Sequence, residues 1–270
     1  MPKRLLLILI LCIPCLLKAQ VENVIPVSMA VANTATARND QWTAFQNPAA
    51  LVQTETFQVA LQYENRYLIG EFSTELLQGA YSNAYVNVGI AYSFFGYERY
   101  SEMMAAVVLA RRFGQFSLGL QGNFIAVYCG DDLGYRMTGV PQLGMTVDIT
   151  PDFTLGFQTF NPFVQSIKVE DHRRKLPSVY SLGTDYRFHK DFRWDVQLDY
   201  DINTTFRIAT GFEWQAIREL CVKLGAYYQQ YLVACLGLGL HFGIFRCDIA
   251  AEWHPVLGVN LMSKLAFQWQ

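Results

Sequence analysis

The sequence is poor in charged residues and has no surplus of basic ones. Charged residues make up 16% of the 270 positions, against roughly 25% in an average soluble domain. Hydrophobic residues make up 52%, so the chain is not disordered, because disorder requires low hydrophobicity and high charge. The formal net charge of −2 offers no basic surface for phosphates, and nucleic acid is therefore not an expected partner.

Long hydrophobic runs are also missing after the first 20 residues. No later stretch reaches the roughly 18 consecutive apolar residues that a membrane-spanning helix needs. Although the composition leans toward a membrane, an ordinary helical membrane protein is excluded.

Residues that carry catalysis or hold metals are few and scattered. The four histidines form no metal-binding spacing, and no nucleophile motif is present. None of the four cysteines after position 20 belongs to a C-x-x-C pair, which argues against a zinc site. We interpret these cysteines as small apolar fillers, with a disulfide as the alternative that export would permit. We expect no enzyme activity, no metal and no cofactor.

The first residues have the pattern of a secretory signal peptide. Lys3 and Arg4 precede an apolar run from Leu5 to Leu17, and Ala19 is a small residue suited to a cleavage site. We assign residues 1–19 to the signal peptide, so the mature chain starts near position 20 and works outside the cytoplasm. A retained membrane anchor is the weaker interpretation because the run is short.

From about Phe57 onward, apolar and polar residues alternate with a period of two, as in half-buried strands. Segment 101–113 is the least regular, because residues 103–110 are apolar on both faces. The expected strands span about 57–63, 75–82, 85–95, 101–113, 115–128, 137–149, 152–160, 178–188, 192–201, 206–214, 220–228, 232–242, 245–253 and 259–269.

The two faces of the later strands differ sharply in charge. Their polar face holds the charged residues, and their apolar face holds none. A charge that faces lipid at mid-membrane costs roughly 2–4 kcal/mol, so the apolar face meets either hydrocarbon or a dry core. A soluble β-sandwich is therefore the other interpretation.

Three observations favour the membrane. The strand number is even, turns are short on one side and longer at 64–74, 129–136 and 161–177 on the other, and aromatic residues gather at strand ends. We therefore predict an all-β fold. It is an antiparallel transmembrane β-barrel of about 14 strands over residues 55–270, surrounded by lipid of the bacterial outer membrane.

Inside such a barrel, opposite charges would face each other across hairpins. The expected register places Asp199 opposite Arg207, Arg193 opposite Glu213 and Asp248 opposite Lys264, and such pairs stabilise a ladder by roughly 0.2–1 kcal/mol each. A solvated polar face without organised pairs is the other interpretation. The candidates for lumen ion pairs are Arg193, Asp195, Asp199, Arg207, Glu213, Arg246, Asp248 and Lys264.

Residues 20–54 do not alternate. Asn39 or Asp40 can cap a short helix, and Pro48 forces an extended backbone at Asn47. The segment is long enough to enter the barrel as a plug, and a tail that stays in the periplasm is the other interpretation. The candidate plug residues are Trp42, Phe45, Asn47, Pro48, Ala49 and Leu51.

A basic cluster lies in the longest predicted loop. The run His172-Arg173-Arg174-Lys175 could meet anionic lipopolysaccharide or a protein partner. A solvated loop tip is an equally good interpretation of the same residues.

Several motifs resemble those of known outer-membrane proteins. The run F-Q-N-P-A-A-L at 45–51 resembles the N-P-A-[GL] hatch motif of the FadL-like barrels. The runs R-R-F-G at 111–114 and F-S-L-G at 116–119, with H-P-V-L-G at 254–258, resemble hairpins of the Bacteroidetes members. Those members include the PorV and PorQ proteins of type IX secretion. Two departures are Ala50, where the FadL group usually has Gly, and a segment at 28–31 without the usual glycines.

The resemblance implies two functions. In the first, the protein is an accessory or interaction component of a secretion or envelope-assembly system, with other envelope proteins as partners. In the second, it is a FadL-like plugged transporter for a small hydrophobic ligand. The transporter would need a cavity lined by apolar plug residues such as Trp42, Phe45 and Leu51.

Overall fold

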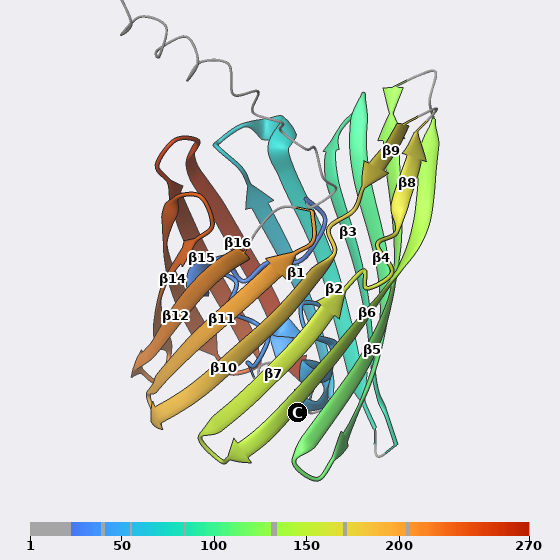
Figure 1. The fold of residues 1–270 in the computed structure, drawn as a ribbon. Coiled ribbons are helices and arrows are strands. Elements are labelled where there is room, and N and C mark those ends of the chain that lie inside the picture. Colours follow the sequence, from blue (N-terminus) through green and yellow to red (C-terminus); the bar gives the residue numbers. More distant parts are fainter. Residues whose placement is uncertain are drawn as a thin grey trace, which may run out of the picture.

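The chain folds into a closed cylinder of antiparallel strands that surrounds its own N-terminal segment (Figure 1). The computed structural model describes residues 23–38, 41–54, 56–83, 85–130, 134–169, 172–203 and 206–269, and the predicted signal peptide lies outside them. Within these residues, no helix has both the length and the apolar character needed to cross a bilayer.

Fourteen strands form the barrel, which confirms the predicted fold class. Each strand pairs with its neighbours in the chain, except that β7 pairs with β10 and β1 closes the ring against β16. The barrel strands are β1 (Phe57–Asn65), β2 (Ser73–Ser82), β3 (Asn87–Tyr97), β4 (Tyr100–Phe113), β5 (Phe116–Cys129), β6 (Tyr135–Thr150), β7 (Phe153–Phe160), β10 (Val179–His189), β11 (Phe192–Asp201), β12 (Phe206–Ile217), β13 (Leu220–Tyr228), β14 (Leu232–Phe242), β15 (Phe245–His254) and β16 (Gly258–Trp269).

The first strand of the barrel pairs with the last along the whole length of β1. The pairing runs without a break from Phe57 opposite Trp269 to Asn65 opposite Leu261. Because no strand edge stays open, every barrel strand has two hydrogen-bonded neighbours.

The apolar face of the ribbon points outward and the ionic face points inward. In β11, Leu198 is 48% exposed on the outside, whereas Asp195 is 1% exposed on the inside. The same alternation occurs in β1, where Leu61 is exposed and Gln58 and Gln62 are buried. An exterior of this kind suits acyl chains, while the charged side chains are enclosed in the interior.

The two ends of the cylinder differ as the sequence predicts. At one end the turns are short, as at 114–115, 151–152, 190–191 and 243–244. The other end has the longer connections, including the short helix η4 (Gly70–Phe72) between β1 and β2. Figure 1 shows the short turns at the lower end of the barrel.

Aromatic rings line the outer face near the short turns. Phe192 stacks between Phe188 and Trp214, with ring centroids 5.6 and 5.9 Å apart. Phe212 contacts both Phe188 and Phe192. Such a girdle is typical of the interface between hydrocarbon and water.

The region from 161 to 177 is not the simple loop that we predicted. It contains a two-stranded hairpin, β8 (Ser166–Val169) and β9 (His172–Lys175), at the end of the barrel with the longer connections. Ile167 and Leu176 pack into an apolar cluster inside the barrel. Four-residue strands are too short to give a clear period, which explains why the sequence pattern did not reveal them.

Candidate functional site

The N-terminal segment lies inside the barrel against the inner wall. Its described parts, 23–38 and 41–54, contain the short helices η1 (Met29–Val31), η2 (Gln41–Thr43) and η3 (Pro48–Gln53). Most of their side chains are buried, and η3 contacts β4, β5 and β6 while η1 contacts β13, β14 and β15. The segment therefore spans the lumen from one wall to the other.

Inward-facing glycines let the backbone of the segment approach the wall. Gly119 and Gly144 lie opposite each other on β5 and β6. A Cβ atom on Gly119 would collide with the main chain at Pro48 and Ala49, and one on Gly144 would collide with Asn47. No larger residue fits at these two positions without moving the segment.

Asn47 and Pro48 fix the local path of the segment. The Asn47 side chain is buried, and its Oδ1 accepts a hydrogen bond from the Ala49 N–H at 3.0 Å, which caps η3. Its Nδ2 donates to the carbonyl of Thr36. Pro48 occupies the first helical positions, where a missing N–H is tolerated. The motif residues therefore join two stretches of the segment.

The apolar residues of the segment pack against small residues of the wall. Phe45 and Leu51 lie in a cluster with Ala44 and the wall residues Leu76, Ala80, Ala91, Ala106, Val108 and Ala110. Trp42 packs on Ala60 and Ala266. This packing explains why β4 is apolar on both faces: its inner face meets the segment instead of a polar lumen.

Wall side chains hold the main chain of the segment. Most of these wall side chains donate to carbonyl oxygens of the segment. In one case the Oε1 of Gln197 accepts a hydrogen bond from the N–H of Thr36 at 3.0 Å. The pairs, with the donating wall residue first and the residue of the accepting carbonyl second, are Thr74 and Asn23, Ser93 and Val24, Gln62 and Val27, Arg207 and Ala32, Lys264 and Trp42, Gln142 and Gln46, and Asn87 and Leu51.

Arg38 is a buried ionic tie between the segment and the barrel, and it was not among the residues predicted from the sequence. Its guanidinium pairs with Asp195 at 3.4 Å and with Glu213, and its side chain is 3% exposed. Burying a cation needs such compensation. The available signal was that no other Lys or Arg occurs between Lys18 and Arg66.

The predicted lumen residues lie inside the barrel in the expected register. Asp199 lies opposite Arg207, Arg193 opposite Glu213 and Asp248 opposite Lys264. Several of these side chains form ion pairs with residues other than the one directly opposite, because long side chains reach diagonally to neighbouring strands.

Asp199 pairs with Arg207 at 2.6 Å. Arg193 reaches Asp185 at 2.8 Å, while Glu213 pairs with Arg38. The remaining contacts join Lys223 and Arg246 to Asp248 at 2.6 and 2.8 Å, and place Lys264 over the ring of Trp42 at 5.2 Å from its centroid.

The basic cluster on β9 turns partly inward. Arg174 pairs with the fully buried Glu102 of β4 at 3.1 Å and lies over the ring of Tyr100. The hydroxyl of Tyr100 and the amide of Asn23 also donate to Glu102. Arg174 therefore ties the hairpin to β4 and departs from the expected loop tip in solvent, whereas Arg173 and Lys175 are exposed as that interpretation predicts.

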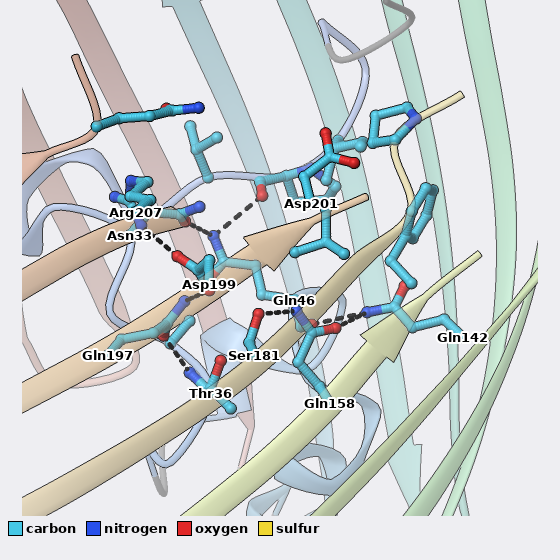
Figure 2. Close-up of a pocket in the computed structure, with 18 of the residues that line it drawn as sticks. Asn33, Thr36, Gln46, Gln142, Gln158, Ser181, Gln197, Asp199, Asp201 and Arg207 are labelled. Carbon is cyan, nitrogen blue, oxygen red and sulfur yellow. Dashed lines mark hydrogen bonds and ion pairs between the residues drawn. The ribbon is translucent and has the colours of Figure 1, made fainter. Parts of the chain in front are cut away.

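A cavity of about 270 Å³ lies between the segment and the wall formed by β6, β7, β10, β11 and β12. Figure 2 shows the glutamine, aspartate and arginine side chains that surround it. Trp42, Phe45 and Leu51 do not line it, because they are buried against the wall on other sides. The apolar cavity that a hydrocarbon transporter would need is therefore not formed by these residues.

The described residues contain no group of three or more His, Cys, Asp or Glu side chains that could hold a metal ion. The cysteines at 129, 221, 235 and 247 are all free. The site thus consists of hydrogen-bonding and ionic side chains around a segment of the same chain.

Together these features define a closed barrel of fourteen strands whose lumen holds its own N-terminal segment. No protein-family model matches the sequence, and no curated protein matches it significantly. Solved structures with the same fold include the Pseudomonas putida toluene transporter TodX, with a TM-score of 0.68 and 10% identity over 90% of this chain and 98% of that one.

Two further structures have the same fold. The CymD monoaromatic hydrocarbon channel gives a TM-score of 0.64 and 11% identity, and the match covers 92% of this chain and 98% of that one. A Pseudomonas aeruginosa FadL homologue gives 0.62 and 12%, covering 92% and 99%. The fold is therefore that of the FadL-like outer-membrane barrels.

Proposed function

We propose that this protein is a non-enzymatic transport barrel of the bacterial outer membrane, reached by export with cleavage after residues 1–19. In this proposal residues 20–54 act as its plug, and a small compound passes between plug and wall. The cavity beside the segment is the observation that carries the proposal, because it is a space inside the barrel that a ligand can occupy.

Two further observations support the proposal. Large apolar side chains are exposed on the outer face all around the barrel, as a membrane protein requires. The proteins of the same fold include a toluene transporter and a monoaromatic hydrocarbon channel.

Flux of labelled solutes into vesicles tests the proposal. The full-length protein is reconstituted into liposomes, and the uptake of small polar and apolar compounds is compared with that of protein-free vesicles. We expect faster entry of at least one class of small compound and exclusion of larger solutes. Equal entry with and without protein for every solute contradicts the transport function.

A second candidate is an accessory role in secretion or envelope assembly, as the PorV- and PorQ-like motifs imply. It is favoured by the many bonds that fix the segment to the wall, since a fixed plug suits a scaffold better than a gate. Purification from the native outer membrane in mild detergent tests it. A stoichiometric partner protein supports this role, and recovery of the barrel alone contradicts it.

A further inference from the structure

We propose that the cavity beside the N-terminal segment binds a small, uncharged, polyhydroxylated compound of about the size of one sugar ring. The inference rests on the proposed transport function, and it names the class of compound. It departs from the hydrocarbons named for the channels of the same fold, because the lining of this cavity has a different chemistry.

A polar row crosses four neighbouring strands at the cavity wall. Gln158 of β7 lies opposite Ser181 of β10, which lies opposite Asp199 of β11, which lies opposite Arg207 of β12. The strand register brings these four side chains into line, and each strand contributes a different polar residue. The row presents donors and acceptors on one surface.

Hydrogen bonds fix this row before any ligand arrives. Gln142 donates to Gln158 at 3.3 Å, and Gln158 donates to the Ser181 hydroxyl at 2.8 Å. Gln197 donates to Asp199 at 2.7 Å (Figure 2). Fixed amide and hydroxyl groups both donate and accept, which matches the hydroxyl groups of a polyol.

The charges of the lining cancel. Its ionic residues are Arg66, Asp199, Asp201 and Arg207, so the two cations balance the two carboxylates. Asp199 is paired with Arg207 at 2.6 Å, and Asp201 accepts from the N–H groups of Ser178 and Asn203. A charged ligand would find no surplus of opposite charge, which favours a neutral one.

An apolar ligand fits poorly for a different reason. It would leave the remaining donors and acceptors of the polar row without a hydrogen-bond partner, and each unsatisfied buried group costs about 1–3 kcal/mol. The apolar part of the lining offers surface to the C–H groups of a sugar ring; it consists of Ile25, Pro26, Val27, Ala35, Phe160, Pro177 and Val179.

The size of the cavity limits the ligand. A volume of about 270 Å³ lies just below the roughly 300–1,000 Å³ of small-molecule sites. This space suits a single ring or a short polyol better than a long acyl chain or an oligosaccharide.

Saturation-transfer NMR on the full-length protein tests the inference. The protein is held in lauryldimethylamine oxide, which has no sugar headgroup, and D-glucose, D-mannitol and toluene are the probes. We expect binding of at least one of the two polyols in the millimolar range. Toluene binding that replaces polyol binding overturns the inference.

Variants place the binding in the cavity. Gln158→Leu breaks the polar row, and we expect it to weaken polyol binding at least tenfold. Gln78→Leu is the matched control, because Gln78 also lies on the inner face, where it is buried, but does not line the cavity. Ser181→Ala removes one hydroxyl only, and it serves if Gln158→Leu does not fold. Polyol binding that is unchanged in the folded cavity variants overturns the inference.

The vesicle flux separates this inference from the proposed function. Binding that depends on Gln158 or Ser181 without any flux contradicts transport and leaves the ligand class standing. Flux of sugar-sized solutes without such binding contradicts the ligand class and leaves transport standing.

Discussion

The barrel packs its lumen in two different ways on two sides. Along β3 to β6, an apolar cluster of Phe95, Met104, Ile125 and Val140 closes on Val24 and on Ile167 of the β8–β9 hairpin. Along β10 to β16, ion pairs lie beside small apolar clusters, such as that of Met29, Ala30, Ala250 and Met262. The segment therefore carries both kinds of contact: Leu51 packs in an apolar cluster on one side, and Arg38 forms ion pairs on the other.

The ionic side should be the more sensitive to a single substitution. Arg38→Met leaves Asp195 and Glu213 buried without their cation, and breaking such a pair costs about 3–5 kcal/mol. We expect the free energy of unfolding in detergent micelles, measured with guanidinium chloride, to fall by this amount.

Arg112→Met is the control for Arg38. Arg112 pairs with Asp148, but its side chain is 48% exposed, and surface pairs contribute about 0–1 kcal/mol. Equal losses for the two variants would show that Arg38 does not anchor the segment.

The apolar side should respond through cavity formation. Leu51→Ala removes a fully buried side chain from the cluster with Phe45 and Val108, which costs about 2–5 kcal/mol. The same unfolding measurement checks the loss. Leu120→Ala on β5 is the control, because Leu120 is 53% exposed on the outer face. A larger loss at Leu120 would contradict the packing described for η3.

A substitution at Gly119 tests whether the N-terminal segment must approach the wall closely. Gly119→Val would push Pro48 and Ala49 away from β5, and overpacking of this kind costs about 1–3 kcal/mol. We expect faster proteolysis of the N-terminal segment in the folded barrel. Gly122→Val provides the matched control, since a Cβ there meets open space. Similar proteolysis of both variants would refute the close-approach argument.

The ion pair between Glu102 and Arg174, which holds the β8–β9 hairpin, should give the smallest effect. Glu102→Gln removes the charge that holds Arg174, and we expect local opening to become easier by about 1.4 kcal/mol, which is a tenfold change. Limited trypsin digestion at β9 measures it as a tenfold faster cut. Glu75→Gln on the exposed face of β2 is the control. An unchanged rate in Glu102→Gln would mean that the hairpin is held by Ile167 and Leu176 alone.

Much of the barrel could be predicted because each strand repeats one simple rule. The outward residue must suit lipid and the inward residue must not, so period and charge together give the strands and the register of Asp199 with Arg207. The rule fails at β4, where the inner face meets the segment, and at β8 and β9, which are too short to show a period.

The interior could be predicted only in part. Pro48 predicted an extended backbone at Asn47, which the structure has, but the partner of the Asn47 side chain, Thr36, depends on how the segment folds back. The role of Arg38 depends on Asp195 and Glu213, more than 150 residues away in sequence. The cavity lining is likewise a product of five strands and no single motif encodes it.

The hydrogen bonds from wall side chains to main-chain carbonyls of the segment have a consequence for sequence change in evolution. Gln142, Ser93 and Asn87 bind the main chain of the segment, and every residue type offers the same carbonyl. Mutations that swap side chains along this stretch leave those bonds in place as long as the backbone keeps its course. Selection then acts on the wall residues, because the amides and hydroxyls that donate these hydrogen bonds cannot change as freely.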